Sequence, residues 1–167
     1  MGAEPGAGGG GGYGREGALL RSYAGLVAAF NATFAGALWG ATRAGHPLPE
    51  RVSAGDVALL GAATFTRSRL LARDRVTSVV RAPFTEYQGA AGHGEVDERA
   101  RGDGVRRAVG ELLVCPYCVS QWVAGGFAVR LVVAPRATRL VAATFATVGA
   151  ADTLQLAYRA AEDRLAG

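Results

Sequence analysis

The feature that most constrains this chain is a run from Tyr23 to Ala41 that carries no charged residue. A helix rises about 1.5 Å per residue, so a run of this length crosses or nearly crosses a hydrocarbon core about 30 Å thick. Tyr23 and Trp39 lie near its two ends, where interfacial aromatic residues are typical. The run therefore predicts a membrane-spanning helix over 23–41, which we interpret as a signal anchor rather than a cleaved signal peptide.

Three further apolar runs follow, over residues 57–71, 114–134 and 138–160. The first of them contains Arg67 and Arg69, so it spans a bilayer only if both reach the surface or pair with an acid. A half-buried interfacial helix is the alternative for that run. The expected fold is all-α, an integral membrane bundle of about four transmembrane helices. Their expected ranges are 23–41, 55–72, 115–134 and 138–158.

The two ends of the chain are predicted to lie outside this membrane domain, which we expect over residues 18–160. Residues 1–17 are mostly glycine and cannot bury apolar surface, so they predict a disordered tail. Residues 161–167 are expected to form a short C-terminal tail. The mean hydropathy is +0.17 although charged residues crowd the middle of the chain, so the apolar residues are concentrated elsewhere.

Residues 73–111 form a polar segment that we expect to be a cytoplasmic loop. Nine arginines lie between Arg67 and Glu111, half of the 18 basic residues in the chain. Basic residues favour the cytoplasmic side, which places this loop and both termini in the cytoplasm. Within the loop, the glycine-rich stretch 89–104 is predicted to be mobile, and 105–113 a short amphipathic helix.

The arginines of this loop are candidate binding residues. Arg73, Arg75 and Arg81 would supply positive charge to an anionic lipid or to a protein partner. The alternative is that they only orient the chain in the membrane. A sequence pI near 9.6 is also compatible with nucleic acid. The arginines, however, are mixed with acids beside apolar segments, so we expect no nucleic-acid partner.

The only two cysteines, Cys115 and Cys118, belong to the string CPYC at the start of the third long apolar run. Pro116 suits the first turn of a helix, so we expect a helix to begin near Cys115, with both sulfurs on one face. Two interpretations stay open: packing thiols, or the nucleophile and resolving cysteine of a membrane thiol–disulfide oxidoreductase. A zinc site would need two more ligands, so no metal and no other cofactor is expected.

Asp152 interrupts the last apolar run, and an acid within a membrane is costly unless it is paired. In the predicted topology the second and fourth helices run in the same direction. Asp152 then lies at a depth similar to that of Arg67 and Arg69. We therefore predict a structural ion pair between Asp152 and one of these arginines. The alternative, a proton or ion site in a transport subunit, would require a homo-oligomer to enclose a pore.

The chain carries no P-loop, no nucleophile elbow and only two histidines, so no nucleophile–base pair can be proposed. The sequence thus favours a non-enzymatic membrane protein.

Three motifs together resemble a bacterial family of small integral-membrane proteins, domain of unknown function 1360. They are ATFTRSRLLARDRVTSVVRAPFTEYQG, then GELLVCPYCVSQWVAG, then DTLQLAY. The resemblance covers roughly Tyr23 to Tyr158. It implies a multi-pass membrane protein in a bacterium, in contact with the lipid bilayer, and it implies no particular substrate.

Overall fold

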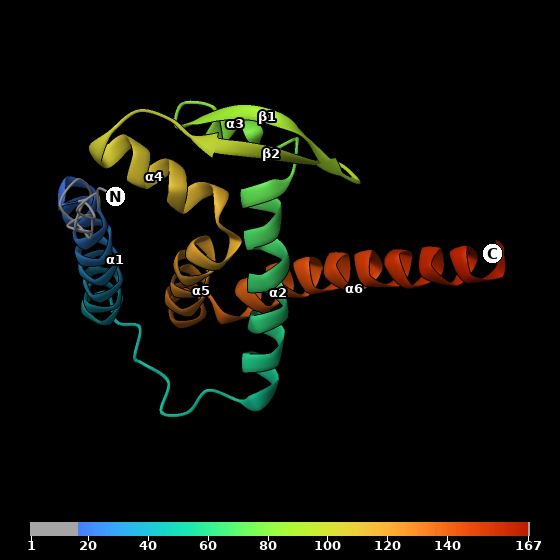
Figure 1. The fold of residues 1–167 in the computed structure, drawn as a ribbon. Helices are drawn as coiled ribbons and strands as arrows, with labels where there is room; N and C mark the ends of the chain where they lie inside the picture. Colours follow the sequence, from blue (N-terminus) through green and yellow to red (C-terminus); the bar gives the residue numbers. More distant parts are fainter. Residues whose placement is uncertain (1–16, 167) are drawn as a thin grey trace, which may run out of the picture.

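The computed structural model describes residues 17–166, and the predicted glycine-rich tail therefore lies outside the described residues apart from Gly17. The described chain is mostly helical (Figure 1). In chain order its elements are α1 (Gly17–Arg43), α2 (Ala54–Arg73), α3 (Ser78–Arg81), β1 (Thr85–Gly92), β2 (Glu95–Ala100), α4 (Gly104–Val114), α5 (Pro116–Val133) and α6 (Pro135–Ala166).

Helix α2 lies at the centre of the bundle and packs against both α5 and α6. The core between these helices is small, with Ala63, Phe127 and Ala142 as its buried members. Small residues let helix backbones approach closely, which explains how so few large side chains hold three helices together. Helix α1 packs on the other side, against α4 and α5, where the Phe30 ring meets Trp122 edge-on at 5.3 Å between centroids.

Two described helices are long and apolar enough to cross a membrane, over Leu19–Arg43 in α1 and Pro135–Leu165 in α6. Helices α4 and α5 would make a third span only as a pair, and an angle of 85° separates them. Helix α2 is not apolar enough to count as a membrane-crossing helix, because it carries several charged residues. The expected number of four spans therefore stays a prediction.

The polar segment after α2 is folded, so the expectation of an all-α chain is wrong there. Strands β1 and β2 form an antiparallel hairpin, and Gly92 and Gly94 turn its tip with φ angles of 105° and 87°. The stretch 89–104, which we expected to be mobile, supplies much of this hairpin. The predicted short helix over 105–113 is confirmed as α4. We call α3, β1, β2 and α4 together the cap.

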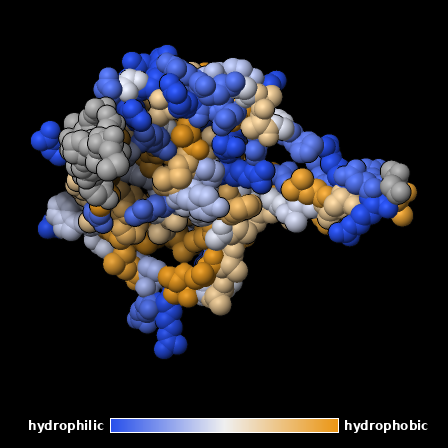
Figure 2. All heavy atoms as spheres, in the orientation of Figure 1, coloured by the Kyte–Doolittle hydropathy of each residue, from blue (hydrophilic) through white to orange (hydrophobic). Residues whose placement is uncertain are grey.

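The alternation of apolar and polar residues along this segment helps to explain why the cap folds. On β2, Val96 is 3% exposed and packs inward while its neighbour Asp97 points outward. Opposite charges also face each other across the strands, as in the pair Glu86 and Arg99. Figure 2 shows a largely hydrophilic surface over the cap and a more hydrophobic surface over the lower part of the bundle.

The C-terminal helix is longer than expected. Helix α6 continues to Ala166, so the residues that we assigned to a tail are helical as far as that residue. Every residue from 151 to 165 is exposed, and Figure 1 shows this part of α6 running away from the bundle beside the hairpin tip. We call residues 151–165 the arm.

Candidate functional site

Arg81 holds the cap together and is not free to bind a ligand. Its side chain is buried and donates hydrogen bonds to Glu98 Oε2 at 2.6 Å and to Thr77 Oγ1 at 2.7 Å. It also donates to the backbone carbonyls of Leu71 and Asp74, at 2.6 and 2.9 Å. The expectation that Arg81 binds lipid or a partner is therefore wrong. The fork of the guanidinium joins the end of α2, the turn after it and β2.

The other two candidate arginines have different surroundings. Arg73, the last residue of α2, lies 3.6 Å from Asp97 and 4.0 Å from Glu95, so these two acids of β2 already balance its charge. Arg75 is exposed, and its side chain makes no ion pair among residues 17–166. Its backbone N–H donates to the Gly94 carbonyl at 2.9 Å, which fixes this turn against the hairpin tip.

Three valines follow Arg75 closely in the chain and are strongly exposed. Val76 is 84% exposed, Val79 75% and Val80 59%. Exposed apolar side chains that are grouped together commonly mark an interaction surface. We call Arg75, Val76, Val79 and Val80 the arginine–valine patch.

The two cysteines lie at the corner between α4 and α5. Helix α5 begins directly after Cys115, and Cys115 Sγ caps it by accepting a hydrogen bond from the Cys118 N–H at 3.3 Å, so the expected helix start is confirmed. Both thiols are free, and their sulfur atoms lie 2.6 Å apart. Cys118 also lines a cleft of about 370 Å³ between α1 and α4, together with Tyr23 and Glu111.

The predicted ion pair of Asp152 with Arg67 or Arg69 is not formed. Arg69 donates instead to Glu95 Oε1 at 2.7 Å, because the hairpin brings this acid to the end of α2. The guanidinium of Arg67 lies 5.0 Å from the centre of the Phe145 ring. Asp152 makes no ion pair within the described chain.

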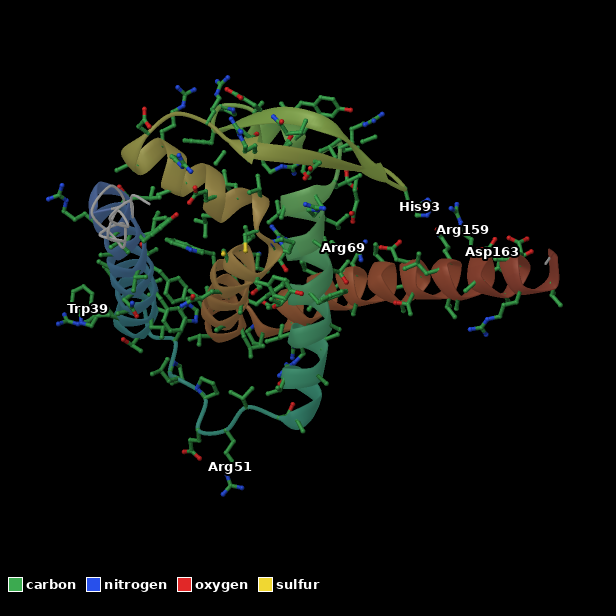
Figure 3. The ribbon with its side chains drawn as sticks, in the orientation of Figure 1. Trp39, Arg51, Arg69, His93, Arg159 and Asp163 are labelled. Carbon is green, nitrogen blue, oxygen red and sulfur yellow. The ribbon has the colours of Figure 1, made fainter. Side chains whose placement is uncertain are left out.

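Asp152 and Arg69 nevertheless line one cleft of about 440 Å³, bounded by α2, the hairpin tip and α6. Across it, Arg159 Nη1 lies 2.8 Å from His93 Nδ1, and Figure 3 shows these two side chains pointing toward each other from the arm and the tip. The hairpin residues of this cleft were missed by sequence reasoning. The tip sequence GHG was the available signal, since two glycines around one residue are typical of a tight turn.

Another ion pair, which the sequence did not predict, joins α2 to α6 at the end of the bundle away from the cap. Arg139 donates to both carboxylate oxygens of Asp56, at 2.7 and 2.9 Å. Ser53 caps α2, and its hydroxyl also donates to Asp56.

Within residues 17–166, no three His, Cys, Asp or Glu side chains come together in a way that could hold a metal ion.

The sequence profile of the family described as "Protein of unknown function (DUF1360)" matches residues 59–158. This chain belongs to that family. A curated relative is "Sporulation protein YjcA" of Bacillus subtilis (strain 168), which is 32% identical over 102 residues, or 59% of this chain and 86% of the relative. No solved structure matches the chain. The resemblance seen in the sequence is thus confirmed, and the matched range contains the cap, the cysteines and most of the cleft, whereas α1 lies outside it.

Proposed function

We propose that this chain is a non-enzymatic, multi-pass membrane protein whose cap lies in the cytoplasm and docks a protein partner. The arginine–valine patch carries this proposal, because it presents exposed apolar side chains beside an arginine without an acidic partner in the described chain. Such a patch suits a partner surface with an apolar centre and an acidic residue at its edge. The relative is named as a sporulation protein, and we propose that this chain acts in the same process.

The charge of the cap favours a protein over an anionic lipid surface. Residues 73–111 contain seven arginines and seven acids, so the segment has no net positive charge. Attraction to an anionic membrane depends on an excess of basic residues. Two of the three arginines that we considered as lipid ligands, Arg73 and Arg81, already pair with acids of the cap. The arginine–valine patch is small and partly apolar, as in a protein interface.

Site-specific photocrosslinking in living cells of the native bacterium tests the proposal. A photoreactive residue replaces Val79, and a control probe replaces Val105, an exposed valine at the start of α4 in the cap. We expect one discrete crosslinked protein with the Val79 probe and none of it with the Val105 probe. Arg75→Glu should abolish the crosslink, whereas Arg51→Glu, on an exposed residue of the α1–α2 linker, should not.

Other results would contradict the docking of a protein. Crosslinks to lipid alone at Val79 would support the anionic-lipid alternative. A protein crosslink that survives Arg75→Glu unchanged would remove the patch from the interface.

A second candidate function is thiol–disulfide exchange at Cys115 and Cys118. The adjacent positions of the two thiols at the start of α5 favour it, because loss of two protons and two electrons to a disulfide or quinone acceptor would join their sulfur atoms. Maleimide labelling of intact cells, with and without prior reduction, separates the two functions. Labelling that requires reduction supports the redox function, and labelling without reduction by a permeant reagent alone supports free thiols that face the cytoplasm.

A further inference from the structure

One face of α6 points into the cleft beside the hairpin tip. Gln155, Leu156 and Arg159 stand three, four and seven residues after Asp152, and residues with this spacing share one side of a helix. All four line the cleft. Asp152, Gln155 and Arg159 therefore lie together at this cleft, and Gln155 and Arg159 also line a second, more open hollow farther along α6.

The polar groups of this face are mostly without partners. In the part of the chain that the structure describes, neither the Asp152 carboxylate nor the Gln155 amide makes a side-chain hydrogen bond. Among the described residues, the Arg159 side chain hydrogen-bonds only with His93, through Nη1. Arginine has donors but no acceptor, so His93 accepts through a ring nitrogen, and the other guanidinium N–H groups stay available. The cleft thus offers a carboxylate and an amide at one end and a guanidinium at the other.

We propose that this cleft binds a zwitterionic group that carries a primary ammonium and a phosphate. The ammonium would donate to Asp152 and to the Gln155 carbonyl oxygen, and the phosphate would accept from Arg159. The backbones of Asp152 and Arg159 are about 10 Å apart along the helix axis. The long arginine side chain can reach back across much of that distance toward a phosphate.

Simpler ligands fit the cleft less well. A metal ion would require several oxygen or nitrogen ligands, and the described residues form no such group. A simple anion would leave Asp152 without a partner, and a simple cation would do the same for Arg159. A ligand with both charges satisfies the two ends at once.

The apolar side chains around the cleft suit a phospholipid such as phosphatidylethanolamine, whose hydrocarbon part would lie against them. Phe65, Val148 and Leu156 line the cleft and are 65%, 38% and 50% exposed. In Figure 2 the arm leaves the body between the hydrophilic surface of the cap and the hydrophobic surface below it. A head group lies at such a boundary. Free phosphoethanolamine carries the same two charged groups, so the experiment must separate the two sources.

The experiment uses the full chain, purified in detergent. Native mass spectrometry measures the occupancy of phosphatidylethanolamine and phosphatidylcholine at equal concentrations, and calorimetric titration measures the binding of free phosphoethanolamine. The variants are Asp152→Asn and Arg159→Gln. Their matched controls, Asp163→Asn and Arg164→Gln, change exposed charges on the same helix beyond the cleft. Circular dichroism checks that each variant keeps its helical content.

We expect each cleft variant to weaken phosphatidylethanolamine binding about tenfold, as for the loss of one hydrogen bond to a charged group. The controls should bind as the unaltered chain does. Phosphatidylcholine should bind about tenfold more weakly, because its quaternary ammonium has no N–H to donate. Binding of free phosphoethanolamine with the same dependence on both variants would identify a soluble ligand as the source, and binding of the lipid alone would identify the membrane.

Three results would overturn the proposal. Equal occupancy of the two lipids would show that the ammonium is not recognised. Unchanged binding in both cleft variants would place the ligand elsewhere. Failure of both the lipid and the free compound to bind would show that the cleft does not take this class of ligand.

Discussion

The cap and the arm are two polar regions that lie side by side, yet they use their charged residues in opposite ways. In the cap, the Arg81 and Glu98 side chains are 1% and 5% exposed and bond to each other. In the arm, Asp152 is exposed and has no ion-pair partner in the described chain. The cap and the first residues of the arm both lie within the range that the family profile matches. The charged residues of the cap mainly build the fold, whereas those of the arm stay available for the ligand that we propose.

The strongest test of this difference between the cap and the arm is to replace Arg81 with methionine. The change would leave Glu98 buried without its partner, a situation that costs about 3–5 kcal/mol of stability. We expect the cap to unfold first, with amides of β1 and β2 losing protection in hydrogen exchange. Arg75→Met, on an exposed residue between α2 and α3, should alter the free energy of unfolding by less than about 0.5 kcal/mol. Equal protection in the two variants would show that Arg81 does not hold the cap.

The next largest effect is expected where α4 packs on the hairpin. A Cβ added at Gly110 would lie 2.5 Å from the Phe84 carbonyl oxygen and 2.9 Å from the Ala100 Cβ. Gly110→Ala should therefore destabilise the protein by about 1–3 kcal/mol, measured by denaturation in detergent. Gly126→Ala is the control, since an added Cβ there meets nothing within 4 Å. A Gly110 variant as stable as this control would mean that α4 moves freely on the sheet.

The sequence was sufficient to predict the longer helices, because long apolar runs and a proline in the first turn are local signals. The start of α5 after Cys115 and the short helix before it could both be predicted, whereas α3 was not predicted. The hairpin was missed because its glycines suggested mobility, while its strand signal depends on pairing between residues that are apart in sequence. The burial of Arg81 could not be predicted without knowing that this sheet exists.

The contacts of the candidate site also could not be predicted without knowing that the hairpin exists. Asp152 was identified as a residue that needs a partner, but Arg69 finds its own partner in Glu95, which lies on the missed strand. One unrecognised element thus changed the predicted ion pair. It also created the cleft, because the hairpin tip closes one side of it. The i, i+3, i+4, i+7 spacing from Asp152 was visible in the sequence, but nothing there showed which surface it would face.

The end of the bundle away from the cap offers a smaller test. Arg139 donates to both carboxylate oxygens of Asp56, and the Ser53 hydroxyl donates to the same carboxylate. Asp56→Asn should destabilise the protein because it leaves the Arg139 guanidinium without an acid beside it, and Arg139→Gln should have a similar effect. The double variant should be scarcely less stable than either single variant, since both changes break the same interaction, as thermal denaturation in detergent can show. Effects that simply add in the double variant would contradict the ion pair.

The smallest effect is expected where the cap and the arm meet. The contact between Arg159 and His93 is exposed, and a hydrogen bond of this kind contributes about 0.5–1.5 kcal/mol. His93→Ala should therefore leave global stability nearly unchanged while freeing the arm from the hairpin tip. Spin labels at Arg99→Cys and Asp163→Cys, in a chain with Cys115→Ser and Cys118→Ser, would report a broader distance distribution. Glu162→Gln is the control, since it alters a nearby charge outside this contact. If His93→Ala leaves the distribution as narrow as this control does, the arm is held by its own helix, and the cleft keeps its shape without the histidine.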